Sequence, residues 1–582
     1  MHKQIVRRDE QAKPALLEAG LSPLLARIYS SRGVERPDQL DNSLKGLLPF
    51  HTMRDIEPAA ELIAEAIEAG QRLLVVGDFD CDGATSSALA VSALRALGAQ
   101  WAGYLVPNRF EYGYGLSPEI VAVAEQQQPD LLITVDNGIS SVAGVRAAKE
   151  AGIKVVVTDH HLPGDELPEA DALVNPNQHG CDFVAKNTCG VGVIWYVMTA
   201  VCRRLQTRGW FERRQQPVPN MADFLDLVAL GTVADVVPLD HNNRILVDQG
   251  LKRIRAGRCR PGIKALAEIA SRQLDKLVAT DLGFAIGPRL NAAGRLEDMS
   301  IGIECLLSRS EPEARALALQ LDELNQDRKQ IEQQMQRQAL KILDQISLDD
   351  ETELPYGVCL FEPDWHEGVI GILASRIKER LHRPVIAFAE AEGGMIKGSA
   401  RSIPGLHIRD VLAAVEAREP DLLAKYGGHA MAAGMSLERD KFERFSRAFD
   451  AEVRRQLDEE QLQARIESDG AMAVAEMNLE MARQLRDGGP WGQLFPEPLF
   501  DGEFELVQQR IVGERHLKLV LAPIEQGRPS GFCIDAIAFN VDLDVWPSQS
   551  NRARVAFKLD INEFRGRVSP QLMVDYLEPI SE

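Results

Sequence analysis

The stretch Val75-Val76-Gly77-Asp78-Phe79-Asp80-Cys81-Asp82-Gly83 decides the fold class and points to the chemistry. Its three aspartates alternate in a short loop that directly follows an apolar run over residues 73–76. In an extended backbone, residues two apart point the same way, so the three carboxylates are expected to converge on one point. Negative charges so close repel one another unless a cation or a phosphate-bound metal lies among them. The stretch therefore predicts a metal site at the end of a strand.

A calcium loop of the EF-hand type is the obvious alternative, because it also begins with alternating aspartates and a glycine. Such a loop needs a bidentate Glu where this chain has Leu89. It also follows a helix, whereas the run over 73–76 is typical of a strand. The EF-hand interpretation fails on both counts.

The region from about residue 71 to residue 159 alternates short apolar runs with amphipathic stretches. Such alternation is typical of βαβ units around a parallel sheet. We expect strands over 73–76, 103–106, 131–135 and 155–158, and helices over 86–97, after Ser117-Pro118-Glu119 and over 142–151. In such sheets ligands bind beyond the carboxyl ends of the strands. Three acidic or histidine motifs follow these runs, namely Asp78/Asp80/Asp82, Asp136-Asn137-Gly138 and Asp159-His160-His161.

The length of 582 residues is too great for one core, and about three or four domains are expected. We expect an N-terminal segment over 1–50, a parallel-sheet α/β domain over 51–305, a long connecting helix over 306–350, a second α/β domain over 351–457, and a C-terminal β-domain over 458–582. The long helix is predicted from apolar residues that recur at three- and four-residue steps between 312 and 346. Alternating strands over 504–512, 517–521, 533–539 and 555–562 predict a small β-barrel or sandwich.

The composition argues against several classes of protein. No apolar run is long enough to span a bilayer, and the polar start gives no secretory signal. The eight cysteines are scattered without a C-x-x-C pair, and His179, Cys181 and Cys189 lack a fourth zinc ligand. We therefore expect a cytoplasmic protein with reduced thiols and no membrane partner. The net charge of −21 argues against indiscriminate nucleic-acid binding but allows a local basic groove.

The predicted metal set comprises Asp78, Asp80, Asp82, Asp136, His160 and Asp235. Asp235 is included because it follows an apolar helix expected over 224–233, where a carboxylate is costly unless it is paired or metal-bound. Oxygen ligands favour Mg²⁺ or Mn²⁺, and the imidazole favours Mn²⁺. So many ligands suit two ions, roughly 3.5–4 Å apart, which activate a bridging water and stabilise both oxygens at a reacting phosphorus. Separate helix caps and surface histidines would explain each motif alone, but not all of them together.

These motifs, together with Gly231-Thr232-Val233-Ala234-Asp235, resemble in type and order those of the DHH phosphoesterase superfamily. Further segments are similar to those of its RecJ family of single-strand exonucleases: Pro107-Asn108-Arg109 and residues 287–295, 321–325, 365–372 and 427–434. The resemblance covers almost the whole chain. It implies hydrolysis of single-stranded DNA from the 5′ end to 5′-mononucleotides with Mn²⁺ or Mg²⁺. It also implies a role in recombination and repair, beside a helicase and a single-strand-binding protein.

The resemblance assigns roles to the residues of the first domain. Asp80, Asp82, Asp136, His160 and Asp235 match the family's metal positions, with Asp136 as the bridge. Whether Asp78 is a ligand or supports one stays open. His161 is expected to touch the scissile phosphate, and Asp159 to orient its neighbours.

The second domain resembles the DHH-associated domain, which captures substrate. Gly427 and Gly428 would let backbone N–H groups approach a phosphate, while Ser399, Arg401 and His429 supply a hydroxyl and charge. Tight turns are the ordinary alternative for such glycines.

Four further residues of the first domain are expected to contact DNA. Arg109 lies in a loop with Tyr114, a cation beside a stacking ring, which suits a terminal nucleotide. Half-buried loop packing is the alternative for the tyrosine. Arg289 and Arg295 lie in what we interpret as a Gly- and Ala-rich loop that tracks the strand's backbone. The C-terminal region resembles an oligonucleotide-binding (OB) fold, and its basic side chains are candidates for phosphate contacts, although charged strand faces are commonly just solvated.

Two other functions are alternatives to this interpretation. A DHH phosphoesterase that acts on short oligonucleotides or cyclic dinucleotides needs, as a rule, no such C-terminal domain. A non-catalytic replication scaffold with the same fold should have broken metal motifs, whereas every ligand position is present in this chain.

Overall fold

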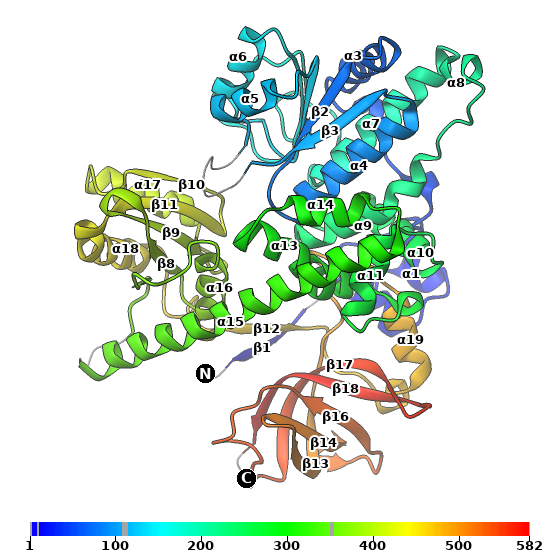
Figure 1. Ribbon diagram of the computed structural model, residues 1–582. Helices are drawn as coiled ribbons and strands as arrows, with labels where there is room; N and C mark the ends of the chain where they lie inside the picture. The colour runs from blue at the N-terminus through cyan, green and yellow to red at the C-terminus, as the bar shows by residue number, and fades with distance from the viewer. Residues whose placement is uncertain (1–2, 9–10, 108–114, 350–353, 581–582) are drawn as a thin grey trace. The chain divides into compact units, whose positions relative to one another are not determined.

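The computed structural model describes residues 3–8, 11–107, 115–349 and 354–580 (Figure 1). Arg109 and Tyr114, predicted to contact a terminal nucleotide, lie outside the described residues. The chain divides into two compact units. The larger unit comprises Arg7–Asp322 and the chain from Glu467 onwards, and the smaller comprises Glu323–Ile466 and the chain up to Val6. Within the described ranges, no helix combines the length and apolar character that crossing a bilayer requires.

A five-stranded parallel sheet of order β3-β2-β4-β5-β6 is the centre of the larger unit. Its strands are β2 (Arg72–Val76), β3 (Trp101–Leu105), β4 (Leu131–Val135), β5 (Lys154–Thr158) and β6 (Ala172–Val174). Strand β4 is buried at every position, as expected where helices cover both faces. The predicted parallel sheet is confirmed. The three-residue strand β6 was not expected, because so short an apolar run gives no periodic signal.

Helices cover both faces of this sheet (Figure 1). Helices α4 (Cys81–Leu97) and α7 (Gly190–Thr207) lie on one face, where they pack on each other. Helices α5 (Pro118–Glu125) and α6 (Val142–Glu150) lie on the other and form a core with alternate strand residues such as Leu74. Ser117 caps α5 as expected, since its hydroxyl accepts a hydrogen bond from the Ile120 N–H.

A group of helices follows the sheet in sequence. It comprises α9 (Leu225–Ala234), α10 (His241–Arg255), α11 (Pro261–Ile269), the π-helical turn η6 (Leu282–Ile286), α13 (Gly287–Leu296) and α14 (Ser300–Leu307). The prediction of a loop around Arg289 and Arg295 is wrong, because both lie in α13. The glycines suggested a loop, but one of them instead permits close packing. A Cβ added at Gly294 would lie 1.8 Å from the carbonyl oxygen of Phe79.

Shorter elements complete the larger unit and its borders: α1 (Pro14–Glu18), α2 (Pro23–Ser30), α3 (Ile56–Glu68), α8 (Trp210–Arg213), α12 (Ala279–Asp281), α19 (Leu479–Asp487), and the two-stranded sheet of β1 (Gln4–Arg7) and β12 (Arg465–Ser468). The long helix α15 (Glu311–Asp349) runs from the larger unit into the smaller. The predicted long connecting helix is thereby confirmed.

The smaller unit contains a mixed sheet of order β10-β11-β9-β8-β7. Its strands are β7 (Val358–Phe361), β8 (Val385–Glu390), β9 (Met395–Arg401), β10 (Lys425–Gly428) and β11 (Ala432–Glu438), and its helices are α16 (Ile370–Leu381), α17 (Ile408–Arg418) and α18 (Phe442–Gln456). Only β7 and β8 pair in parallel among these described strands. Phe388, Phe445 and Phe449 lie at the centre of the core. The predicted second α/β domain is confirmed.

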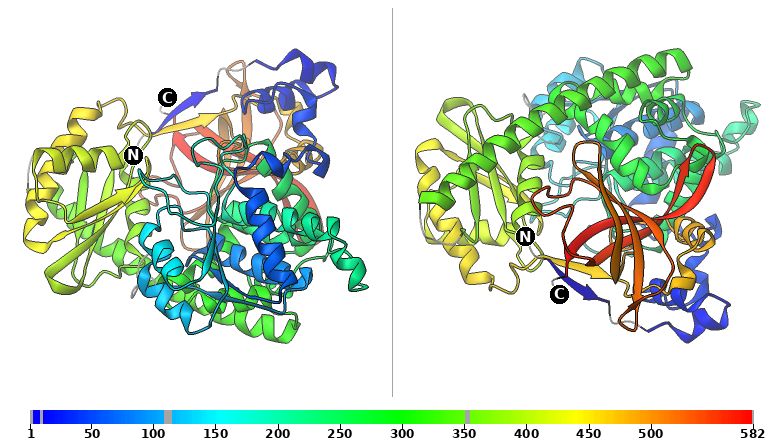
Figure 2. Two further views of the ribbon diagram at one scale, coloured as in Figure 1. Left: turned by 90° about the horizontal axis from the view of Figure 1, so that it is seen from above. Right: turned by 90° about the horizontal axis from the view of Figure 1, so that it is seen from below.

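A closed β-barrel lies near the C-terminal end of the larger unit's sequence (Figure 2, orange and red strands). Its strands are β13 (Phe500–Val512), β14 (His516–Glu525), β16 (Ile534–Ala538), β17 (Arg552–Phe564) and β18 (Arg567–Pro579), with the short β15 (Arg528–Pro529) beside β14. The order β13-β17-β18-β16-β14 is closed by pairing of β13 with β14. Of the two predicted alternatives, the barrel is correct and the sandwich is not.

The N-terminal segment is tied to the chain that precedes the barrel. Arg32 Nη1 lies 2.8 Å from Asp469 Oδ1, and both side chains are 1 % exposed. The ring of Tyr29 stacks on Trp491, which in turn stacks on Phe495. Two segments predicted as separate ends of the chain therefore share one packed region.

Candidate metal centre

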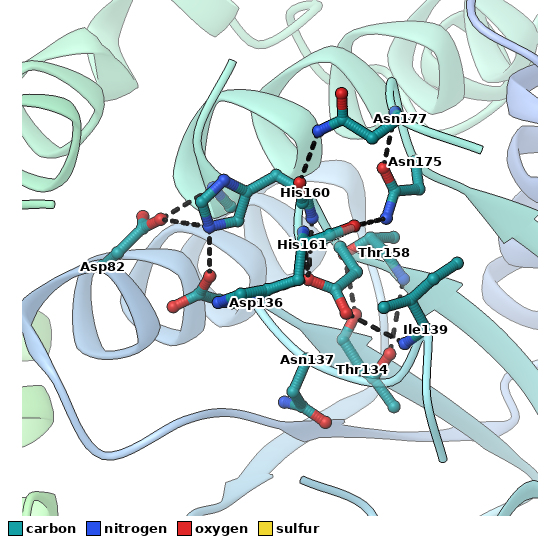
Figure 3. Close-up of polar contacts among 12 residues, drawn as sticks. Asp82, Thr134, Asp136, Asn137, Ile139, Thr158, His160, His161, Asn175 and Asn177 are labelled. Atoms are coloured by element: carbon teal, nitrogen blue, oxygen red, sulfur yellow. Dashed lines mark hydrogen bonds and ion pairs between the residues drawn. The ribbon is translucent and has the colours of Figure 1, made fainter. Parts of the chain in front are cut away.

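The predicted metal ligands gather at the carboxyl ends of β2, β4 and β5. Figure 3 shows Asp82, Asp136 and His160 directed at one another. The Nε2 atom of His160 lies 3.1 Å from Asp136 Oδ1, 3.6 Å from Asp235 Oδ2 and 3.8 Å from Asp82 Oδ2. Asp235 reaches this point from the C-terminal end of α9.

Three groups of side chains place possible ligand atoms within 4.8 Å of one another. They are Asp78, Asp80 and Asp136; Asp82, His160 and Asp235; and Asp136, His160 and His161. All six predicted metal residues fall into these groups. Asp136 belongs to two groups, so its carboxylate is placed between neighbouring candidate sites.

The expected convergence of the three alternating aspartates through an extended backbone is wrong. Helix α4 begins at Cys81, and Asp80 caps it by accepting the Gly83 N–H at 3.0 Å. Asp82 therefore lies in the first helical turn. The turn separates it from Asp78 and Asp80, so the three carboxylates fall into two groups.

Asp82 is held by the N-terminus of a second helix. Its two carboxylate oxygens accept the N–H groups of Gly190 at 2.7 Å and Val191 at 2.8 Å, in the first turn of α7. Gly190 is required at this point because a Cβ there would lie 2.6 Å from the Cβ of Asp136. Burial and the charge of Asp80 raise the pKa of Asp82 to about 7, against the opposing effect of the two backbone hydrogen bonds.

Burial and mutual repulsion also dominate the other carboxylates. The pKa values of Asp136 and Asp235 are raised well above their ordinary range, first by burial and then by the charges of neighbouring aspartates such as Asp82. A cluster of this kind ionises fully only if positive charge is brought among its members. The donor set of carboxylate oxygens with one imidazole fits Mn²⁺ or Mg²⁺.

The turn after β4 fixes the carboxylate of Asp136. This residue adopts a left-handed conformation with a φ of 60°, which Asp tolerates better than most residues. The side-chain amide of Asn137 donates hydrogen bonds to the carbonyl oxygens of Val76 and Val135. These bonds join the ends of β2 and β4, so the two aspartate-bearing loops are held in register.

Asp159 holds the ring of His161. The carboxylate is fully buried and accepts hydrogen bonds from the backbone N–H groups of Ile139, His160 and His161. It also lies 2.7 Å from His161 Nδ1. Burial alone would raise the pKa of Asp159, but the His161 hydrogen bond and charge hold it below its ordinary value. In the same way, Asp159 raises the pKa of His161 to about 9, against the lowering effect of burial.

Three supporting asparagines were missed by the sequence analysis. Asn177 donates to the carbonyl oxygen of His160 at 2.6 Å, and Asn175 donates to that of His161 at 2.9 Å (Figure 3). Asn291 on α13 accepts the N–H of Cys81 at 2.8 Å, at the first residue of α4. The Asn-Pro-Asn sequence at 175–177 is a turn signal that could have drawn attention to the first two.

The two arginines of α13 are placed differently from each other. The Nη2 atom of Arg289 lies 2.8 Å from Asp322 Oδ1, and its side chain is 13 % exposed. A second nitrogen of Arg289 donates to the carbonyl oxygen of Ala285. Arg295 is half-buried in the last turn of α13.

In the smaller unit, Ser399 and Arg401 lie two residues apart on β9. Arg401 Nη1 donates to Ser399 Oγ at 3.0 Å and to its neighbour's carbonyl oxygen, and burial lowers the pKa of Arg401. A Cβ at Gly371, in the first turn of α16, would lie 2.7 Å from Arg401 Nη2 and 3.0 Å from Ser399 Oγ. No carboxylate among the residues that the structure describes forms an ion pair with Arg401. A guanidinium at a helix N-terminus without a counter-charge is suited to an anion.

The predicted phosphate-binding glycines lie on a hairpin next to β9. In register, Gly427 faces Gly434 across the hairpin, and Gly434 faces Ser399. Gly428 has a φ of 145° and no room for a Cβ, which would lie 2.4 Å from Ala433 Cα, so the tight-turn alternative holds for it. A Cβ at Gly427 would meet nothing within 4 Å, and Gly427 and His429 are both exposed.

Three family models match successive parts of the chain. They are described as "DHH family, N-terminal domain" for residues 72–232, "DHHA1 domain" for residues 354–455 and "RecJ OB domain" for residues 468–576. The chain is 56 % identical over 582 residues to "Single-stranded-DNA-specific exonuclease RecJ" of Escherichia coli, with 100 % of both chains covered. Its identity to the Salmonella typhimurium protein of that name is also 56 %, over 99 % of each chain. The chain belongs to the RecJ family.

Solved structures of RecJ support the same conclusion. A crystal structure of RecJ from Thermus thermophilus in complex with Mn²⁺ matches with a TM-score of 0.81 at 31 % identity, covering 100 % of this chain and 81 % of that one. The corresponding Mg²⁺ complex matches with a TM-score of 0.75 at 28 % identity, covering 100 % and 79 %. The predicted DHH superfamily membership, three-part fold and OB-type barrel are thus confirmed for this RecJ family member.

Proposed function

We propose that this chain is a metal-dependent 5′-to-3′ exonuclease specific for single-stranded DNA, which releases 5′-mononucleotides. The observation that carries the proposal is the convergence of all six predicted metal residues, in a chain 56 % identical along its length to exonucleases of that specificity. The RecJ OB match over 468–576 argues against an enzyme confined to short oligonucleotides or cyclic dinucleotides.

Two ions, Mn²⁺ or Mg²⁺, would share the ligand set. Asp78, Asp80 and Asp136 would hold one, and Asp82, His160 and Asp235 would hold the other, which makes Asp78 a ligand and Asp136 the bridging candidate. Bound there, the ions would lower the pKa of a shared water and neutralise charge that develops on the phosphate.

His161 would contact the scissile phosphate. Its Nδ1 is engaged by Asp159, so a contact with the phosphate would be made through Nε2. The hydrogen bond and charge of Asp159 raise the pKa of His161 and so favour the protonated ring, which suits a donor to an anionic oxygen. Asp159 would be a positioning residue, because it fixes the ring and its charge.

The smaller unit would capture a phosphate of the strand. The buried guanidinium of Arg401, the hydroxyl of Ser399 and the helix N-terminus beside them support this role. The backbone at Gly427 and Gly428 and the imidazole of His429 would add contacts from the hairpin.

In the larger unit, Arg109, Tyr114 and Arg295 stay candidates for DNA contact. Arg289 would act on DNA only indirectly, because Asp322 already occupies its guanidinium. We propose the same division of labour as the sequence suggested, with catalysis in 51–305, the connecting helix in 306–350, capture in 351–457 and strand tracking in 458–582, packed against the N-terminal 1–50.

The cellular setting follows from the substrate. An enzyme that degrades single strands in recombination and repair needs a helicase to expose them and meets the single-strand-binding protein that coats them. The cytoplasm is the proposed location, supported by eight cysteines that are all free.

The test uses a long single strand labelled at either end, with Mn²⁺ or with EDTA. The 5′ label should appear at once as mononucleotide, whereas the 3′ label should shorten gradually. Asp136→Ala should abolish cleavage, because it removes a ligand from two groups, while strand binding persists. Asp165→Ala, an exposed carboxylate, is the control. Initial release from the 3′ end would overturn the polarity, and normal turnover by folded Asp136→Ala would overturn the metal assignment.

A further inference from the structure

Phe284 is an exposed aromatic residue at an unusual backbone position. Its exposed fraction, 83 %, is the highest of the large apolar residues in the described ranges. It lies in the single π-helical turn η6, between Leu282 and Ile286, which are both fully buried. The turn is therefore anchored on both sides while the ring faces solvent. Single π-turns are frequent at functional sites.

This turn packs on the helix that carries a metal ligand. A Cβ at Gly283 would lie 3.2 Å from Val233 Cγ1, and one at Gly287 would lie 3.1 Å from Ala234 Cβ. Glycine thus lets η6 and α13 lie close against the last residues of α9. These contacts fall one and two residues before Asp235, so the turn that contains Phe284 packs against the end of α9 that leads into Asp235.

A second exposed apolar residue flanks the same ligand. Val236 directly follows Asp235, is 64 % exposed and has a φ of 59°. A β-branched residue in the left-handed region is strained, and such strain is found mainly where function requires the conformation. An exposed apolar residue thus directly follows Asp235 in the chain, and another lies in the turn that packs on the end of α9.

The backbone next to Phe284 is held by a hydrogen bond from Arg289. Arg289 donates a hydrogen bond to the carbonyl oxygen of Ala285, the residue after Phe284, and is itself fixed by Asp322 on α15. The residue predicted to bind DNA thus supports the turn that presents the ring.

We propose that Phe284, with Val236 beside Asp235, is a stacking platform for an unpaired base of the strand being degraded. This inference rests on the proposed exonuclease function and adds a determinant of its single-strand specificity. The ring carries no charge for a phosphate, but its π-face suits any base, so stacking tolerates every sequence. A base inside a duplex is already stacked and paired, and it can reach the platform only after unpairing.

The test compares Phe284→Ala, Phe284→Leu and Phe284→Trp on two single strands. One is normal DNA, and the other has abasic residues throughout its 5′ half. Stacking on one ring is worth about 1–3 kcal/mol, so Phe284→Ala should weaken use of normal DNA on the order of tenfold. Phe284→Leu should behave like Phe284→Ala, and Phe284→Trp like the wild type. Val218→Ala, an exposed apolar residue in a loop, should change nothing.

The abasic strand provides the decisive comparison. Wild type and all Phe284 variants should degrade it at similar rates, because no base is present to stack. Equal losses on both strands, or no loss on normal DNA, would overturn the platform. Binding by the same variants carrying Asp136→Ala should follow the same order. If the wild type fails to degrade single strands at all, the proposed function fails, whereas ring-dependent binding of normal DNA would still identify the platform.

Discussion

Gly294 of α13 has no room for a side chain against the loop that carries Asp78 and Asp80. A Cβ at position 294 would lie 1.8 Å from the carbonyl oxygen of Phe79, whereas real Cβ contacts are essentially never under 3.0 Å. Gly294→Ala must therefore move the loop or the helix by at least 1.2 Å (3.0 − 1.8). The oxygen belongs to the backbone, so no change of rotamer relieves the clash.

The size of the effect follows from this displacement. A misplacement of about 1 Å can cost on the order of 100-fold in rate, which corresponds to about 2.7 kcal/mol. Overpacking costs about 1–3 kcal/mol of stability, while alanine in a helix returns about 1 kcal/mol relative to glycine. We therefore expect Gly294→Ala to fold and to lose cleavage on the order of 100-fold. Weakened Mn²⁺ binding should accompany the loss, because the loop carries ligands.

The assay pairs single-turnover cleavage of end-labelled single-stranded DNA with calorimetric titration of Mn²⁺. The control is Gly302→Ala in α14, where the added Cβ meets only the side-chain ends of Met299 at 3.1 Å and Leu290 at 3.2 Å. Flexible side chains can give way, so this variant should stay close to the wild type. Unchanged cleavage and Mn²⁺ affinity in Gly294→Ala would refute the idea that α13 fixes the loop.

Two further predictions concern a substrate contact and stability. Arg401→Ala should raise the KM for DNA and reduce sensitivity to a 5′-phosphate without changing Mn²⁺ affinity. Arg401→Lys is the control that preserves the charge. Weaker Mn²⁺ binding with intact DNA affinity in Arg401→Ala would contradict the prediction. Burial would raise the pKa of Asp469, but the hydrogen bond and charge of Arg32 hold it below its ordinary value. The ionised Asp469 therefore stabilises the fold fully above the unfolded pKa of about 3.9. This stabilisation is lost as the pH falls towards the folded pKa. Between about pH 5 and pH 3, the free energy of unfolding measured with urea should thus fall more steeply with decreasing pH in the wild type than in Asp469→Asn. An equal pH dependence in the two proteins would contradict the assignment.

The sequence was sufficient for four of the five strands of the parallel sheet and for the place of the candidate metal centre. These four strands were short apolar runs, and three of the motifs stood directly after one, so the topology of βαβ units brought those motifs to one edge. The long helix α15 and most barrel strands were predictable for the same reason, since their periodicity is local. These features need no knowledge of which distant segments touch.

The remaining features of the site depend on contacts between distant segments. Asn291 accepts the N–H of Cys81 across 210 residues, and no local pattern indicates that partnership. The segment around Gly294 was interpreted as a loop because its glycines were taken as breakers, whereas tertiary packing against Phe79 required them. The grouping of the aspartates was likewise decided by where α4 begins, one residue after its capping Asp80.

The N-terminal segment shows why the domains cannot be separated by cutting the chain near Leu457. Because the predicted catalytic and phosphate-binding residues all precede residue 458, the sequence alone predicts that the region beyond it is dispensable for cleavage yet matters for holding a long strand. In the structure, such a cut removes Asp469 and leaves the Arg32 guanidinium, 1 % exposed, without its carboxylate. Breaking a buried ion pair in this way costs about 3–5 kcal/mol.

The same cut would also remove a hydrogen bond close to the candidate metal ligand Asp235 in the sequence. The carbonyl oxygen of Gln493 accepts the N–H of Leu239 at 2.8 Å, four residues beyond Asp235. Loss of activity after truncation would therefore follow from damage to the catalytic domain as readily as from loss of strand tracking. Substitutions of exposed basic residues on the barrel, such as Arg567 on β18, leave these contacts intact. Such substitutions therefore test whether the barrel binds DNA without also removing the contacts that stabilise the catalytic domain.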